Sequence, residues 1–155
     1  MNEFKIEFNF TLEMLKEAMP DCSQDFELLF NIFNEIFPKY RISNVERVTG
    51  FIEQFSYKSD NFKNIQVLRP TTESMLRQFA TFNKIPTAEA NKYCDTLKGS
   101  IDSAGWYWNI KYLNNIADNF DFKNLTDRIN PKSNVNERKE NFSRIYLILQ
   151  QGSNK

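Results

Sequence analysis

Apolar residues recur every three or four positions along most of the chain, which is the spacing of one face of an α-helix. Two such segments, 11–19 and 25–37, end at Pro20 and Pro38. Proline interrupts a helix beyond its first turn, so each segment is predicted to be a helix that stops at its proline. The same spacing predicts helices at 43–58, 72–82, 87–97, 101–116 with a possible break, 122–130 and 135–149.

Two of these helix starts carry a capping-box signature, in which a polar residue is followed three positions later by glutamate. Ser43 with Glu46 opens the third helix, and Asn134 with Glu137 opens the last. Lys58 extends the apolar stripe of the third helix by three residues beyond Phe55. The following segment, 61–70, is predicted to be extended or irregular and to pass the helix end at Lys58, where a cleft would lie.

Length and composition set the limits of the architecture. The chain has 155 residues, of which 41% are hydrophobic, enough for one core but too few for two comfortable domains. No segment has the pattern of a β-hairpin. The prediction is an all-α fold with one helical domain over residues 1–150 and a disordered tail over 151–155.

Charge and hydropathy exclude several kinds of partner. Twenty basic and twenty acidic residues cancel without any block of like charge, so no nucleic-acid partner is expected. The N-terminal MNEFKIEFNF contains charged residues among its apolar ones. It therefore predicts neither a secretory signal nor membrane insertion, and synthesis is expected to leave the protein in the cytoplasm.

The absence of histidine from the sequence excludes several kinds of catalytic site. There is no histidine, which excludes a histidine-based triad, a histidine general base and most catalytic zinc sites. No metal and no cofactor are expected. Cys22 and Cys94 are far apart in unlike contexts and are predicted to be free thiols.

Two stretches carry a resemblance to a known family. The stretch YRISNVERVTGFIEQFSYKSDNF is similar to a pattern close to R-x-A-x-F-x-A-Q-x-x-H-E-S, and SAGWYWNIKYLNNIADNFDFKNLTDRIN is similar to A-x-W-F-W…LN…AD…DF…IT…IN. In this order they resemble glycoside hydrolase family 19, the chitinases and phage-type endolysins of the lysozyme-like superfamily. The matching residues are Arg47, Phe51, Gln54 and Ser59 in the first stretch, and Ala104, Trp106, Trp108, Leu113, Asn114, Ala117, Asp118, Phe122, Thr126, Ile129 and Asn130 in the second.

The resemblance implies a trimmed lysozyme-like helical fold, but the residues that would perform hydrolysis are replaced. Tyr57, Lys58 and Ser59 stand where the family has His-Glu-Ser with glutamate as general acid. A lysine, with an ordinary pKa of about 10.4, cannot protonate a glycosidic oxygen and would repel a positively charged transition state. The position of the second carboxylate falls on Gln66 or Val67, neither of which can act as a base. No catalytic residue is therefore assigned.

The segment between the two stretches also departs from the family. Family members have a glycine-rich segment that lines the sugar cleft, whereas residues 82–103 contain a single glycine, Gly99. Asn130, Asn134 and Arg138 fall near family positions that help build the sugar site, although Asn134 would also serve as a helix cap. With Tyr57, Lys58 and Gln66, these three complete the predicted binding residues.

Structural interpretations compete with the functional ones. Lys58 is either a solvated residue that stabilises a helix C-terminus or a contact for a partner. Trp106, Tyr107 and Trp108 could form a sugar-stacking platform, but core packing is favoured, as it is for the phenylalanine-rich helix at 26–37. Glu53 lies on a different helical face from Lys58, so neither it nor Asp60 is expected to replace the lost acid.

Two functions follow. The first is a catalytically inactive family 19-like protein that acts as a binding or accessory module. A protein partner is favoured over weak binding of peptidoglycan or chitin fragments, and the setting would be a phage or a bacterial secretion system, with export by a signal-free route. The alternative is an atypical peptidoglycan or chitin hydrolase that uses relocated carboxylates.

Overall fold

The computed structural model describes residues 5–131 and 135–153. Its secondary structure is helical throughout this part of the chain, without a β-strand, which confirms the all-α prediction. The α-helices are α1 (Leu12–Ala18), α2 (Phe26–Lys39), α3 (Val45–Lys58), α4 (Glu73–Phe82), α5 (Thr87–Tyr93), α6 (Leu97–Ile110), α7 (Leu113–Asp118), α8 (Phe122–Ile129) and α9 (Val135–Gln150), with 3-10 turns η1 (Ile65–Leu68) and η2 (Gln151–Ser153).

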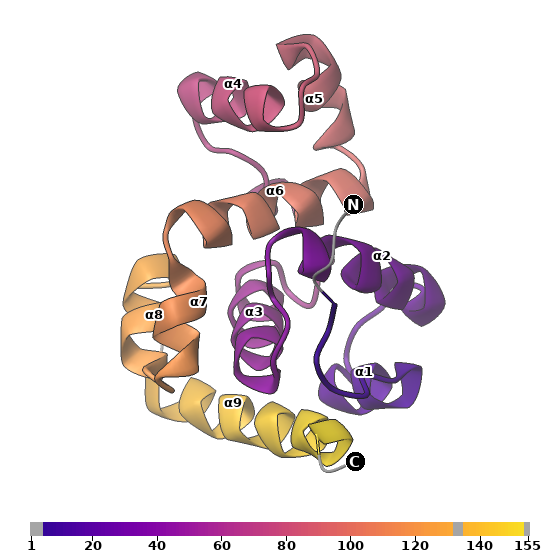
Figure 1. Ribbon diagram of the computed structural model, residues 1–155, viewed down its shortest axis with the longest axis vertical. Helices are drawn as coiled ribbons and strands as arrows, with labels where there is room; N and C mark the ends of the chain where they lie inside the picture. Colours follow the sequence, from indigo (N-terminus) through magenta and orange to yellow (C-terminus); the bar gives the residue numbers. More distant parts are fainter. Residues whose placement is uncertain (1–4, 132–134, 154–155) are drawn as a thin grey trace.

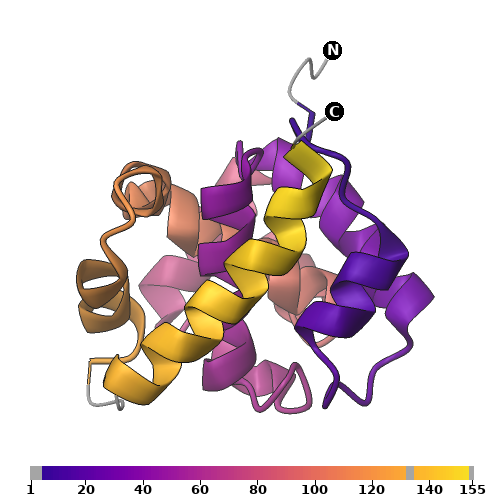
Figure 2. The same cartoon turned by 90° about the horizontal axis from the view of Figure 1, so that it is seen from below.

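Helix α3 is the central helix of the fold (Figure 1). Helices α6, α7, α8, α9, α1 and α2 surround it, and Figure 2 shows α9 crossing diagonally over α3. Ten of its residues are buried, including the polar Glu53 and Gln54. A helix enclosed in this way has to satisfy its polar side chains with partners on the neighbouring helices.

The aromatic residues form much of the core. Phe33, Phe37 and Phe51 are fully buried and their rings are in mutual contact. Trp108 is also fully buried and packs edge-on against Phe51, while Trp106 is 3% exposed. Core packing is therefore confirmed for both tryptophans and for the inner face of the phenylalanine-rich helix.

Helices α4 and α5 form a hairpin that lies beyond α6, away from α3 (Figure 1). Thr72, the first residue of the predicted helix at 72–82, caps α4 through its side chain. The predicted helix at 87–97 is divided, because α5 ends at Tyr93 and the Thr96 side chain accepts a hydrogen bond from the Gly99 amide to start α6. The linker 61–70 contains η1 and is otherwise irregular, as predicted.

Three local expectations need correction. Asn44, not Ser43, caps α3, since its side-chain oxygen accepts a hydrogen bond from the Arg47 amide. Helix α2 does not stop before Pro38, since it continues to Lys39 with the proline inside its last turn, where it removes only one backbone hydrogen bond. The possible break within 101–116 is confirmed at Tyr112, which has a left-handed φ of 56°. The disordered tail does not start at residue 151, because Gln151–Ser153 form η2 and the Gly152 carbonyl accepts a hydrogen bond from the Asn9 amide at 3.0 Å. The predicted cap Asn134 lies outside the described residues.

Candidate functional site

Lys58 is the last residue of α3 and lines a small cavity at the end of that helix. Its side chain is half-buried, and within the described residues its ammonium group has no hydrogen bond or ion pair. Burial lowers the pKa of Lys58 from its ordinary value, because a charged amine loses solvation there. Lys58 is thus more than a solvated helix end.

The cavity is lined by apolar and polar residues from four elements. Its volume is about 120 Å³. The lining residues are Phe55 and Lys58 from α3, Val67–Thr71 from η1 and the following loop, Met75 from α4, and Ser103, Ala104, Trp106 and Tyr107 from α6. This set contains two cations and, among the described residues, no carboxylate.

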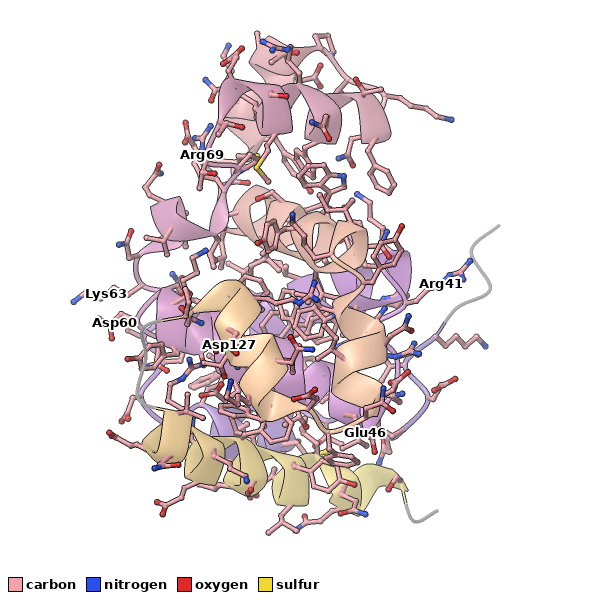
Figure 3. All side chains as sticks on the ribbon, turned by 90° about the vertical axis from the view of Figure 1, so that its left-hand side faces the viewer. Arg41, Glu46, Asp60, Lys63, Arg69 and Asp127 are labelled. Atoms are coloured by element: carbon pink, nitrogen blue, oxygen red, sulfur yellow. The ribbon has the colours of Figure 1, made fainter. Side chains whose placement is uncertain are left out.

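The second cation of the cavity, Arg69, is already engaged. Its guanidinium donates hydrogen bonds to the Asp95 carboxylate and to the Asn91 side-chain oxygen. Figure 3 shows Arg69 between η1 and the α4–α5 hairpin, so the ion pair fastens this hairpin to the linker. Of the two cations, Lys58 is the one with free hydrogen-bonding capacity.

The backbone just after Lys58 is strained. Asp60, Asn61 and Phe62 all have left-handed φ values, 52°, 57° and 64°. For residues other than glycine this conformation costs about 1–2 kcal/mol each, and such strain is concentrated at functional sites. The turn is held by burial of Phe62 and by two hydrogen bonds, from the Phe62 amide to the Ser59 hydroxyl and from the Gln24 side chain to the Phe62 carbonyl.

The predicted binding residues do not gather around Lys58. Gln66 is exposed on η1 and is not part of the cavity wall, whereas its neighbour Val67 is. Tyr57, 52% exposed, lines a different cavity on the α9 side of the helix. Asn130 lies on that side of the molecule too, where its side chain donates hydrogen bonds to the backbone and side-chain oxygens of Gln54 at 3.1 and 3.2 Å. Successive residues of a helix point about 100° apart, which explains the separation of Tyr57 from Lys58.

Arg138 is 3% exposed and forms an ion pair with the 1% exposed Glu53. Its Nη2 lies 2.6 Å from Glu53 Oε1 and its Nε lies 3.2 Å from Oε2. The guanidinium carbon also lies 3.9 Å from the centre of the Tyr57 ring. In this arrangement Arg138 joins α9 to α3 as a structural residue, and a direct role in ligand binding stays a prediction.

The cavity beside Tyr57 is larger and polar, with a volume of about 480 Å³. Three carboxylates, Asp21, Asp60 and Glu137, are among its lining residues, together with Arg144 and Asn141. Asp60 points outward from the end of α3 in Figure 3. The tertiary structure thus brings three carboxylates to this one surface.

A third cavity, of about 320 Å³, contains a polar cluster that the sequence analysis did not identify. The buried carboxylate of Asp102, on α6, accepts hydrogen bonds from Lys39 at the end of α2, from Tyr40 just after α2 and from Tyr93 at the end of α5. Lys39 also donates to the Asn83 side chain at 2.7 Å. Because these groups satisfy one another, the Asp102 cluster is a structural junction between α2, α5 and α6.

Alkaline pH is expected to weaken the Asp102 cluster. Burial and the neighbouring Asp102 carboxylate raise the pKa of both Tyr40 and Tyr93 above the ordinary value of 10.0. The unfolded chain therefore loses these protons first, so the stabilisation is complete below pH 10 and declines above it, by up to about 1.4 kcal/mol per pH unit for each tyrosine. Urea denaturation between about pH 9 and 11.5 measures this slope, which should be shallower in Tyr93→Phe; parallel curves for the two proteins would contradict it.

Two further searches of the coordinates bear on the function. The described ranges 5–131 and 135–153 contain no grouping of three or more cysteine, aspartate and glutamate side chains suited to a metal ion. They also contain no helix with the length and apolar character needed to cross a membrane. Cys22 and Cys94 are both buried and unpaired with each other.

No protein-family model matches the chain, and comparison with curated proteins and with solved structures gave no match either. The family resemblance therefore rests on the residues alone.

Proposed function

We propose that the chain is a catalytically inactive protein, similar in scaffold to family 19 chitinases and endolysins, that works as a binding or accessory module for a protein partner. The observation that carries this proposal is the wall of the cavity at Lys58, which has an ammonium group and no carboxylate among its described residues. Glycoside hydrolysis needs two carboxyl groups on opposite sides of the scissile bond.

The size of the cavity gives independent support. Ligand sites for small molecules are commonly about 300–1,000 Å³. The cavity at Lys58, about 120 Å³, falls well below that range and has no room for consecutive sugar rings. Residues 82–103, which stand where the family has a glycine-rich segment, include α5 and the first half of α6. A glycan partner is therefore disfavoured relative to a protein.

The packing of the two resembling stretches supports a retained scaffold. Arg47 of the first stretch makes a two-pronged ion pair with Asp118 of the second, at 2.9 and 2.8 Å. Gln54 of the first donates to the Thr126 hydroxyl of the second at 3.0 Å. These residues have structural partners in one another, so their presence is explained without catalysis.

The first experiment is a hydrolysis assay. Purified protein incubated with peptidoglycan or chitin is expected to release no more reducing ends than a boiled control, since an acid and a base each contribute about 10²- to 10⁴-fold and both are replaced. Restoring the two positions in the double variant Lys58→Glu, Gln66→Glu is expected to remain inactive as well. Gln66 is exposed and lies outside the cavity wall, so a glutamate there would not face a glutamate at 58.

One observation favours the alternative function, an atypical hydrolase. The cavity beside Tyr57 is large enough for a sugar and has three carboxylates in its lining. Activity well above the boiled control that disappears in Asp60→Asn or Glu137→Gln would establish this alternative and overturn the proposal. Unchanged background in wild type and both variants would exclude it.

The binding role has its own test. Tagged protein should retain a specific protein from the cells in which it occurs, at micromolar concentration and independently of added chitin or peptidoglycan fragments. A phage or secretion-system setting predicts that the retained protein is a component of such an assembly. If neither a protein nor a wall fragment is retained, the proposed function loses its support.

A further inference from the structure

The cavity at Lys58 has a positively charged group in its wall and no carboxylate among its described lining residues, as a binding site for an anion would. An amine that is half-buried without a partner costs folding free energy, because the protein replaces water around the charge with apolar groups. Within the described residues Lys58 has no hydrogen bond or ion pair to offset that loss. A ligand with a negative charge would supply the missing interaction.

The other charges near the cavity do not supply it. Arg69, the second cation in the wall, is bound to Asp95 and so is nearly neutralised. Asp60 follows Lys58 by two residues, but it lines the cavity beside Tyr57.

The shape of the cavity limits the anion to a small group on a short apolar stem. Liquid water occupies about 30 Å³ per molecule, so 120 Å³ is the space of about four waters. An aspartate or glutamate side chain has four or five heavy atoms and fits that space. Phe55, Met75 and Trp106 provide apolar contact for its methylene groups, and Lys58 provides the charge for its carboxylate.

We infer that the cavity at Lys58 receives the carboxylate side chain of an aspartate or glutamate presented by a protein partner. This inference rests on the proposed binding function and names the chemistry that the partner must offer. A deeply seated charged side chain surrounded by apolar contacts is the kind of residue that dominates the energy of an interface.

The two tryptophans allow a direct measurement. Trp106 lines the cavity, whereas Trp108 is fully buried in the core and is not part of the cavity wall. In ¹H–¹⁵N spectra, N-acetylglutamate N-methylamide should shift the Trp106 indole signal saturably and leave Trp108 nearly unmoved. The neutral probe N-acetylglutamine N-methylamide should shift neither.

Variants identify the amine. Lys58→Gln is expected to abolish the saturable shift, and Lys58→Arg to retain part of it. Lys63→Gln is the matched control, because Lys63 lies close in sequence but is exposed and points away from the molecule in Figure 3. Absence of a saturable shift with the glutamate probe, or a shift that persists in Lys58→Gln, overturns the inference. So does binding of free glutarate with no binding of the peptide-like probe, since the ligand would then be a small acid.

The last experiment, binding of the retained partner to the variants, distinguishes failure of the acidic-side-chain inference from failure of the proposed binding function. A partner retained by wild-type protein should bind Lys58→Gln at least tenfold more weakly and Lys63→Gln with unchanged affinity. If both variants bind it equally well, the binding function stands and the acidic anchor is wrong. If no partner is retained although the glutamate probe binds, the protein-partner assignment fails.

Discussion

Replacing Glu53 by alanine is expected to lower the free energy of unfolding by about 3–5 kcal/mol, because the change leaves the buried guanidinium of Arg138 without its counter-ion. Glu53 is 1% exposed and Arg138 is 3% exposed, so water cannot take the place of the missing carboxylate. Urea denaturation followed by far-UV circular dichroism measures the loss.

Glu73→Ala is the matched control for Glu53→Ala. Glu73 also pairs with an arginine, Arg77, but the two side chains are 69% and 59% exposed. Exposed pairs contribute about 0–1 kcal/mol, so this change should be nearly neutral. Equal losses for Glu53→Ala and Glu73→Ala would contradict a buried ion pair.

A double replacement separates the value of the ion pair from the penalty of breaking it. Burial raises the pKa of Glu53, and Arg138 opposes the shift. Taking both charges of a buried ion pair out of water often costs more than their attraction returns. The apolar pair Glu53→Leu with Arg138→Met should therefore lose less stability than Glu53→Ala alone. If the double variant loses as much stability as Glu53→Leu and Arg138→Met lose together as single variants, the two residues do not interact.

Replacing Asp102 by alanine is expected to cost about 3–4 kcal/mol, the second large effect. The carboxylate accepts hydrogen bonds from Lys39, Tyr40 and Tyr93. Its removal leaves the buried Tyr40 hydroxyl and the partly buried Tyr93 hydroxyl without this acceptor, and among the described residues Lys39 keeps only its hydrogen bond to Asn83.

Asp127→Ala is the control for Asp102→Ala, since Asp127 is half-exposed and pairs only with Lys123 on the same helix. It lies on α8 in Figure 3. Asp102→Asn should fall between the two, because its amide keeps one acceptor oxygen. If Asp102→Ala unfolds at the same urea concentration as Asp127→Ala, the Asp102 cluster does not hold α2, α5 and α6 together.

The expected losses of stability bear on function because they assign structural roles to two acidic residues. Glu53 and Asp102 are the most deeply buried acidic side chains of the described chain, and each is committed to partners that hold helices together. Neither is at the cavity of Lys58. This placement is consistent with the prediction that Glu53 does not act as a catalytic acid, and the carboxylates beside Tyr57 are the ones that the hydrolysis variants test.

The sequence predicted the helices because their signals are local. Apolar spacing placed α2 and α3 within a few residues. The errors are local too. Pro38 was expected to end α2, but it lies inside the last turn of that helix. Ser43 and Asn44 are both good caps and only one can occupy the position.

What the sequence by itself determined is the helical class, the apolar face of each helix and the amine at position 58. Only the tertiary structure decided that Tyr57 and Lys58 face different cavities and that Arg138 forms an ion pair with Glu53. It also decided that Asp102 accepts hydrogen bonds from Tyr40 and Lys39, which are 62 and 63 residues away in the sequence. Helical periodicity depends on neighbours three or four residues apart, whereas these pairings depend on how whole helices cross, which no local pattern records.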